Sequence, residues 1–294
     1  MPPTRILSFD LDDTLWPVAP VIAAAEESLF SWLRERHPRA AHGHSVESMR
    51  ALRARVADEF PAMNHDLTFL RRHALAQQFL ASGHAESLAD EAMEVFFTAR
   101  NRVELYADVR PALTRLRARY RLYAVSNGNA DIERCGIGDL FDGHITARAA
   151  GAAKPDARIF AQLLSIAGAS AAETLHIGDD PLADVIGAAR AGIPAVWLNR
   201  DSREWPGHLE PPTRTVMTLE ELTSHRCDAP RRAVVTRSAL AATSDDCSQK
   251  PPAKAQKNTA NKCCVTSLRR RIADTMVPGE EGHQACNPCL RDLW

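Results

Sequence analysis

The feature that most constrains the fold is a short apolar run that ends in acids, ILSFDLDDTL, residues 6–15. Residues 6–9 have the length and apolar character of a buried strand. Asp10, Asp12 and Asp13 follow at once. At an effective dielectric constant of about 20, two unit charges ~5 Å apart repel each other by roughly 3 kcal/mol. Such a cluster at the end of a buried strand needs compensation, and a bound cation would supply it.

Composition and charge exclude several classes of protein. The 294 residues, 45% hydrophobic and 25% charged, suit one large or two modest domains. A formal net charge of -1 argues against a general nucleic-acid or anionic-membrane binder. No apolar run approaches the ~20 residues that span a bilayer, and the first ten residues lack the zones of a signal peptide. Only Cys135 of the 7 cysteines lies in the first three-quarters of the chain, which favours a reducing compartment. We expect a cytoplasmic protein with no nucleic-acid or membrane partner, and we leave its oligomeric state open.

The hydrophobic period becomes helical after residue 16. Apolar residues recur at helical spacing from Ile22 to Leu33, and three later segments repeat the pattern: SVESMRALRARVADEF, HDLTFLRRHALAQQFL and AESLADEAMEVFFTARNRV. The sequence therefore predicts a helical insertion over residues 17–103. Its polar residues Asn64, His65, Arg71 and Arg72, together with Trp16, are candidates for contact with a ligand, although each has an ordinary surface or capping role as its alternative.

Strands and helices alternate over residues 104–225. The segments RLYAV, TLHI, PAVWL and TVM are typical of strands, and DARIFAQLLSIAG and DVIGAARAG are typical of helices. This alternation predicts a doubly wound α/β domain with a mostly parallel sheet, built from residues 1–16 and 104–225. Residues 226–294 lack sustained apolar periodicity, and we expect a largely disordered tail. A zinc site at Cys286 and Cys289 is disfavoured, because the upstream pair Cys263 and Cys264 does not form a CxxC knuckle.

Unusual polar residues recur where the predicted strands end. SNG follows the strand RLYAV, GDDPLAD follows TLHI, and AAKPD lies between them. Ligands of open α/β sheets bind outside the carboxyl ends of the strands. We therefore expect the candidate residues to meet at one sheet edge: Asp10, Asp12, Ser126, Asn127, Lys154, Asp179 and Asp184. Each motif alone has a structural explanation, such as a turn or a helix cap, but their combination in this order favours a functional site.

These four motifs, within residues 5–224, resemble those of the haloacid dehalogenase (HAD) superfamily. The resemblance implies a mostly parallel, Rossmann-like core with an inserted α-helical cap. It also implies that Asp10 is a nucleophile and Asp12 a general acid and base. Ser126, Asn127 and Lys154 would bind the substrate phosphate. Asp10, Asp12, Asp179 and Asp184 would hold Mg²⁺, with Asp12 contributing its backbone carbonyl. The family often has glycine where this chain has Asp13.

The resemblance implies a Mg²⁺-dependent phosphatase that acts on a small phosphorylated metabolite through an aspartyl-phosphate. Family dehalogenases lack the second aspartate, so Asp12 favours phosphoryl transfer over carbon–halogen cleavage. The phrases FDLDDTLWP and MNHDLTFLRR look most like flavin-mononucleotide and ribitylaminouracil-phosphate phosphatases, although a sugar or nucleotide phosphate also fits. A phosphomutase of the same superfamily stays open as an alternative. A phospho-accepting signalling module is disfavoured by the large insertion and by Asp12.

Overall fold

Six strands pair in parallel in the computed structural model, which describes residues 2–223. Their order across the sheet is β3-β2-β1-β4-β5-β6, so the first strand lies near the middle. The strands are β1 (Ile6–Phe9), β2 (Arg121–Ser126), β3 (Gly143–Thr146), β4 (Thr174–Gly178), β5 (Ala195–Leu198) and β6 (Arg214–Val216). The doubly wound α/β fold predicted from the alternating pattern is confirmed.

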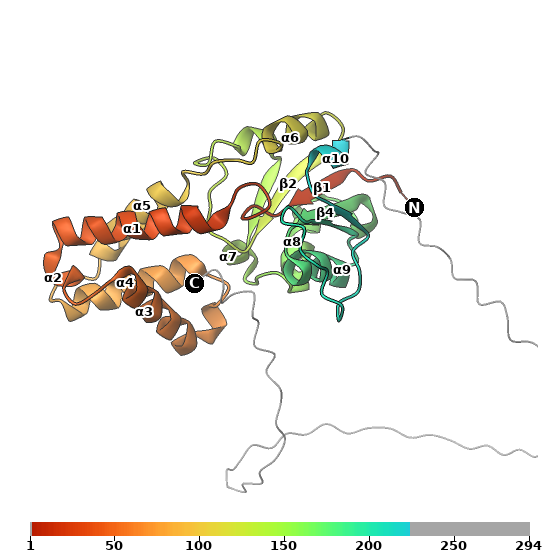
Figure 1. The fold of residues 1–294 in the computed structure, drawn as a ribbon. Coiled ribbons are helices and arrows are strands. Elements are labelled where there is room, and N and C mark those ends of the chain that lie inside the picture. The colour runs from red at the N-terminus through yellow and green to blue at the C-terminus, as the bar shows by residue number, and fades with distance from the viewer. Residues whose placement is uncertain (1, 224–294) are drawn as a thin grey trace, which may run out of the picture. The chain divides into compact units, whose positions relative to one another are not determined.

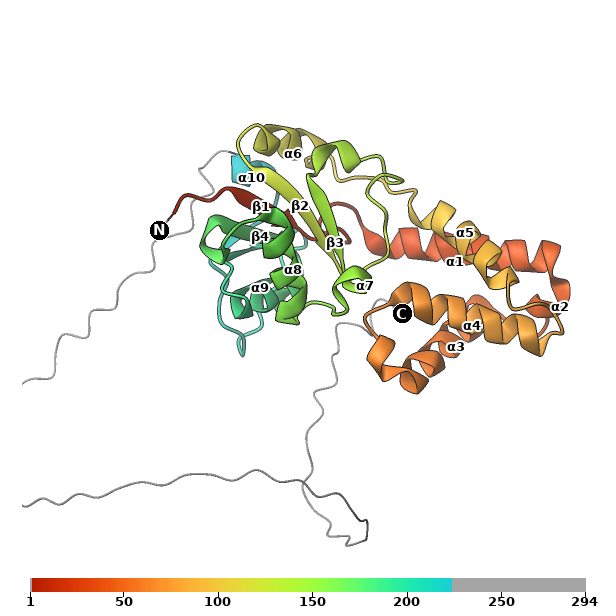
Figure 2. The ribbon, with the colours of Figure 1, turned by 180° about the vertical axis from the view of Figure 1, so that it is seen from behind.

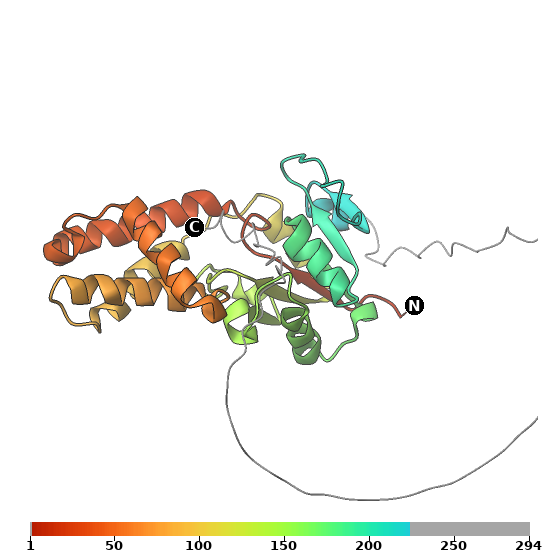
Figure 3. The ribbon, with the colours of Figure 1, turned by 90° about the horizontal axis from the view of Figure 1, so that it is seen from below.

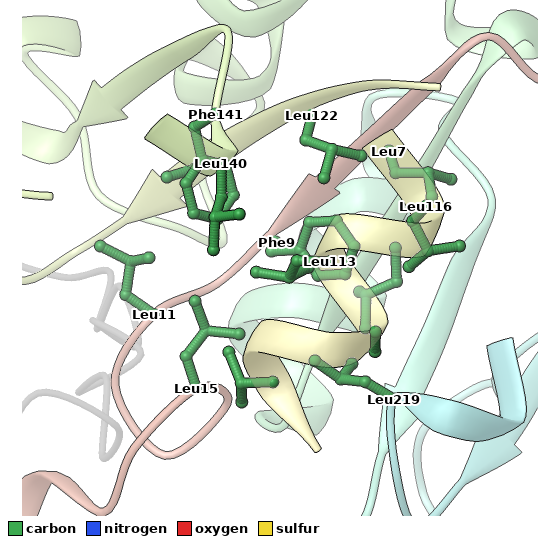
Figure 4. Close-up of a cluster of buried hydrophobic side chains, with 14 of the residues drawn as sticks. Leu7, Phe9, Leu11, Leu15, Leu113, Leu116, Leu122, Leu140, Phe141 and Leu219 are labelled. Atoms are coloured by element: carbon green, nitrogen blue, oxygen red, sulfur yellow. The ribbon is translucent and has the colours of Figure 1, made fainter. Parts of the chain in front are cut away.

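Helices cover both faces of the sheet because alternate strand residues point to opposite sides. Leu7 and Phe9 of β1 pack with α6 (Val109–Arg117) and α10 (Glu220–Thr223) on one face, as Figure 4 shows. Ile6 points to the other face, which α8 (Ala157–Ala167) and α9 (Gly187–Arg190) cover. Shorter segments complete this part: α7 (Ala147–Ala150), the 3₁₀ turns η2 (Gly138–Leu140) and η3 (Ala171–Glu173), and the π-helical turn η4 (Pro181–Ile186).

A second group of helices interrupts the chain between β1 and α6. These are α1 (Val18–Arg36), α2 (Pro38–Ala41), α3 (Val46–Glu59), α4 (Leu67–Ala81) and α5 (Leu88–Arg100), with the 3₁₀ turn η1 (Pro61–Met63). They lie beyond the carboxyl ends of the central strands, drawn in red to orange in Figures 1 and 3. Figure 2 shows α1 and α5 side by side, joined through an apolar core that includes Leu29, Leu33 and Phe96. We call residues 18–100 the helical insertion. No helix of residues 2–223 is long and apolar enough to cross a bilayer.

One strand was not predicted from the sequence. β3 pairs only with β2 and forms an edge of the sheet. Of its four residues only Ile145 is buried, so no apolar run marks it in the sequence. The predicted tail, residues 226–294, and the disfavoured zinc site lie outside the described residues.

Candidate active site

The candidate residues from all four motifs line one cavity of about 290 Å³ at the carboxyl ends of the strands. β1 leads into Asp10 and Asp12, β2 into Ser126 and Asn127, and β4 into Asp179. Lys154 comes from the loop before α8, and Asp184 from η4. We call this space the catalytic cavity. Its lining includes six aspartates and two cationic side chains, Lys154 and Arg203, so its charge is strongly negative.

Lys154 joins two of the acids and is itself only 2% exposed. Its Nζ donates to Asp10 Oδ1, to Asp184 Oδ1 at 2.6 Å and to the carbonyl oxygen of Val125 at 3.0 Å, so three N–H groups have partners. Burial alone would lower the pKa of Lys154, but the two carboxylates raise it above its ordinary value. Burial raises the pKa of Asp10 well above its usual range, and Lys154 opposes that effect only in part. One lysine therefore does not neutralise this group of acids.

A buried hydrogen-bond chain orients Asp184 from behind. His176 Nε2 lies 3.1 Å from Asp184 Oδ1, and His176 Nδ1 lies 2.9 Å from the Ser8 hydroxyl. Burial lowers the pKa of His176, which favours the neutral ring. Because Asp184 accepts, Nε2 carries the proton and Nδ1 accepts from Ser8. A side chain at Gly178 would come within 2.2 Å of Asp184, so glycine is required for this close approach.

Three carboxylates are arranged as a cation site would require. One ligand atom each from Asp10, Asp179 and Asp184 lie within 4.8 Å of one another. Burial, reinforced by Asp184 and Asp13, raises the pKa of Asp179 to about 7. Oxygen ligands suit Mg²⁺. Both oxygens of Asp184 already accept hydrogen bonds, from Lys154 and His176 at Oδ1 and from the Asp180 amide at Oδ2. Asp179 likewise accepts from Thr14 at Oδ1 and from Arg203 at Oδ2. The donor set thus fits a divalent cation, with Asp184 the most heavily hydrogen-bonded of the three acids.

The loop after β2 is held against Lys154. The Asn127 side chain accepts from the Lys154 amide at 2.7 Å and donates to the Lys154 carbonyl oxygen at 2.9 Å. These two bonds fix the Asn127 side chain against the Lys154 backbone and use one of the two N–H groups of its Nδ2. Ser126 Oγ accepts from the Gly128 amide at 2.9 Å and keeps its own hydroxyl proton to donate.

Asp12 is held by two donors. Trp16 Nε1 donates to its Oδ1 at 2.9 Å, and Arg100 Nη2 reaches Oδ1 at 2.7 Å and Oδ2 at 2.6 Å. A side chain at Gly128 would come within 2.5 Å of Asp12 Oδ2. The Asp12 carboxylate therefore lies against the loop that carries Ser126 and Asn127.

Asp13 departs from the glycine that often follows the second aspartate in HAD motifs, and the backbone explains both choices. Its φ of 59° lies in the left-handed region, which glycine adopts without strain and aspartate tolerates better than most residues. Its Oδ1 also accepts from the Val18 amide at 2.8 Å, at the start of α1.

A larger cavity of about 340 Å³ adjoins the catalytic cavity and shares Asn127 and Gly128 with it. We call it the outer cavity. Its walls come from the helical insertion, including His65, Leu67 and Phe97, and from the loop after β2. Arg72 instead pairs with Asp90 within the insertion, at 2.6 Å, in an exposed position. Arg71 pairs with buried Glu26 at 3.3 Å and stacks on Phe96 at 3.8 Å.

Sequence reasoning missed several residues that orient the site. His176 has a recognisable signal, because it is a polar residue inside an otherwise apolar strand, two positions before the acidic motif. Thr14, which donates to Asp179 at 3.1 Å, lies within the first motif. Arg203, 3.3 Å from Asp179, lies in an irregular segment after β5, and Arg100 lies at the end of an ordinary amphipathic helix. Neither arginine carries a sequence signal.

Comparison with known proteins assigns the family. Residues 4–192 match the family model for haloacid dehalogenase-like hydrolases. The chain belongs to this family. A 226-residue stretch is 32% identical to 5-amino-6-(5-phospho-D-ribitylamino)uracil phosphatase YigB of Escherichia coli K12, covering 74% of this chain and 94% of that protein. Phosphoserine phosphatase of Thermus thermophilus is 31% identical over 68% of this chain and 90% of its own length.

The solved structures include a similar member of the HAD family. The crystal structure of 2-haloacid dehalogenase from Pseudomonas syringae pv. tomato DC3000 has a TM-score of 0.72 and 36% sequence identity, and the match covers 75% of this chain and 97% of that one. The prediction of a HAD hydrolase is confirmed, and the chain is an enzyme of the hydrolase class.

Proposed function

We propose that this HAD hydrolase is a Mg²⁺-dependent phosphatase that acts on small phosphate monoesters. One observation carries the proposal: Asp10 and Asp12 line the same cavity, and Asp10 belongs to an acidic cluster that fits a divalent cation. The similarity to two phosphatases over at least 90% of their lengths supports it.

The chemistry divides into two displacements at phosphorus. A carboxylate oxygen of Asp10 attacks, the bond to the leaving oxygen breaks, and Asp12 donates a proton to that oxygen. Water then attacks the aspartyl-phosphate and gives its proton to Asp12, which restores Asp10 and releases phosphate. Ser126 and the neighbouring amides would hold phosphoryl oxygens, and Lys154 would offset their charge. Mg²⁺, held by Asp10, the Asp12 carbonyl and Asp179, would further neutralise charge on the phosphoryl group.

We also propose that the helical insertion acts as a cap over the site and that the outer cavity receives the leaving group. Two acids of its lining are paired, Glu94 with Arg134 at 2.7 Å and Asp66 with Arg148 at 3.3 Å, and the third, Asp131, accepts from the amides of Glu133 and Arg134. Phe97 and Leu67 add apolar surface. This lining favours an uncharged leaving group that forms hydrogen bonds over one with its own ammonium or carboxylate. A ribitylaminouracil-type phosphate therefore suits this cavity better than phosphoserine.

Dehalogenation is the second candidate, because the similar structure from Pseudomonas syringae is named a dehalogenase. Loss of a halide ion requires no proton donor, whereas an alkoxide leaving group does. The Asp12 carboxylate lies in the catalytic cavity beside the loop of residues 126–128, which we call the phosphoryl-binding loop. This position favours ester cleavage.

The test is phosphate release from a panel of monoesters, including flavin mononucleotide, phosphoserine and p-nitrophenyl phosphate. Wild-type enzyme is assayed with Mg²⁺ and with EDTA, beside Asp10→Asn and the matched control Asp139→Asn, an exposed residue of η2. We expect release that requires Mg²⁺, persists in D139N and falls at least about a thousandfold in D10N. D10N that folds and keeps more than a few per cent of wild-type activity would contradict the nucleophile assignment. Chloride release from 2-chloropropionate without phosphate release would support the dehalogenase instead.

A further inference from the structure

Arg100 is the last residue of α5 and the cationic partner of Asp12. Its guanidinium group spans both carboxylate oxygens through Nη2, at 2.7 and 2.6 Å, and its side chain is 1% exposed. Arg100 lines a small cavity of about 20 Å³ beside the catalytic cavity, and Asp12 and Gly128 line both. Arg100 thus contacts Asp12 from the small cavity, and Asp12 in turn lines the catalytic cavity.

The arrangement stabilises the fold poorly. Arg100 Nε and Nη1 are buried and have no hydrogen-bond partner among residues 2–223, and leaving buried donors of a charged group unpaired is costly. An apolar side chain of similar length would fill the same space without that cost. Residues that break such rules concentrate at functional sites. The unpaired donors therefore indicate that arginine occupies this position because its Nη2 binds Asp12, and not because it stabilises the fold.

Arg100 also lies where the chain returns from the helical insertion to the sheet. Asp12 lies just before the chain enters the insertion. The ion pair between Arg100 and Asp12 therefore joins the segment that enters the insertion to the segment that leaves it, which are 88 residues apart in sequence. The next residue, Asn101, accepts from the Asp131 amide at 2.7 Å and ties this return to the loop after β2. The orientation of Asp12 is in this way coupled to the position of α5.

We infer that Arg100 is a positioning residue that holds the Asp12 carboxylate against the phosphoryl-binding loop, where it can exchange a proton with the leaving oxygen. The inference rests on the proposed function. Trp16 alone would fix one oxygen, at 2.9 Å, and leave the carboxylate free to turn about that bond. The second contact, from Arg100 to Oδ2, prevents that rotation.

The experiment compares two esters that differ in their need for a proton donor. Phenyl phosphate releases an alcohol of pKa about 10, as in tyrosine, whereas p-nitrophenyl phosphate releases a much weaker base. For Arg100→Met we expect kcat/KM on phenyl phosphate to fall about a hundredfold, within the range of general acid catalysis. On p-nitrophenyl phosphate the fall should stay below about tenfold. Arg100→Lys should recover most of the loss, and the matched control Arg72→Met, an exposed ion pair of the insertion, should change neither value.

The outcomes separate this inference from the proposed function. Equal losses on both esters, or none, in a folded R100M protein with an active wild type would overturn the positioning role alone. Failure of both R100M and R100K to unfold cooperatively would show a structural anchor and would also overturn it. A wild-type enzyme that releases no phosphate from either ester would overturn the proposed function, and the inference with it.

Discussion

Two buried groups of charged residues in this molecule have opposite compositions, one with an excess of acids and the other with an excess of arginines. In the catalytic cavity, the acids Asp10, Asp179 and Asp184 lie together, and one lysine, Lys154, pairs with Asp10 and Asp184. In the helical insertion, three arginines surround one carboxylate, that of Glu26, which is 4% exposed: Arg50 at 2.6 Å, Arg53 at 3.1 Å and Arg71 at 3.3 Å. We call these the acidic centre and the arginine centre. Each has more charges of one sign than the chain itself balances.

The two centres differ in how the excess charge is accommodated. In the arginine centre, Arg50 remains 38% exposed and Arg71 stacks on Phe96. Burial and the neighbouring Arg53 lower the pKa of Arg71 to about 9, so Arg71 keeps its charge at pH 7. In the acidic centre burial, reinforced by neighbouring acids, raises the pKa of Asp179 to about 7 and that of Asp10 well above its usual range. A centre whose groups keep their charge at pH 7 without a ligand serves stability. A centre in which two of the acids, Asp10 and Asp179, resist ionisation until a cation arrives serves binding.

The largest expected effect tests the arginine centre. Glu26→Gln removes the one buried acid and leaves Arg53 and Arg71 without a counter-charge. Breaking a buried pair in this way costs about 3–5 kcal/mol. Urea unfolding at pH 7 should show this loss of unfolding free energy, and the matched control Glu27→Gln, the exposed neighbour on α1, should stay within about 0.5 kcal/mol of wild type. Equal stability of E26Q and E27Q would show that the arginine centre is not structural.

The same variant predicts a pH dependence. Burial tends to raise the pKa of Glu26, but Arg71, Arg53 and Arg50 lower it below its ordinary value. Because the folded-state pKa is the lower one, the stabilisation is complete above the unfolded pKa of about 4.3 and is lost as the pH falls toward the folded pKa. The difference in unfolding free energy between wild type and E26Q should therefore shrink below about pH 4. A difference that grows on acidification would contradict this assignment of charge.

The acidic centre could be predicted from the sequence, whereas the arginine centre could not. The acidic centre could be predicted because its acids follow apolar strands, and the sheet brings strand ends together whatever the details of packing. The arginine centre could not, since Glu26, Arg53 and Arg71 lie on amphipathic helices in which charged residues are expected to face water. Which of them turn inward depends on how α1, α3 and α4 pack. The contact of Arg100 with Asp12 could not be predicted for the same reason. Strand β3 was not predicted because an edge strand with one buried residue lacks an apolar run.

A smaller effect on stability is expected when a cation binds to the acidic centre. Adding Mg²⁺ at about 100 times its dissociation constant should raise the unfolding free energy by about 2.7 kcal/mol, because the cation binds only the folded chain. Thermal or urea unfolding with Mg²⁺ and with EDTA measures this shift. Asp179→Asn should abolish most of it, and D139N should retain it. Equal shifts in D179N and D139N would place the cation elsewhere.

The smallest effect concerns Asp13, which lies between the acidic centre and α1. Replacement by either glycine or alanine removes the acceptor for the Val18 amide, so that loss is common to both variants. They differ in the backbone, because a φ of 59° is strained for alanine by about 1–2 kcal/mol and not for glycine. Glycine also loses more conformational entropy than alanine on folding, which reduces the difference in stability by about 0.5–1 kcal/mol. Urea unfolding should therefore show Asp13→Gly more stable than Asp13→Ala by up to about 1.5 kcal/mol. The reverse order would mean that the freedom of glycine in the unfolded chain outweighs the backbone strain that alanine suffers at this position.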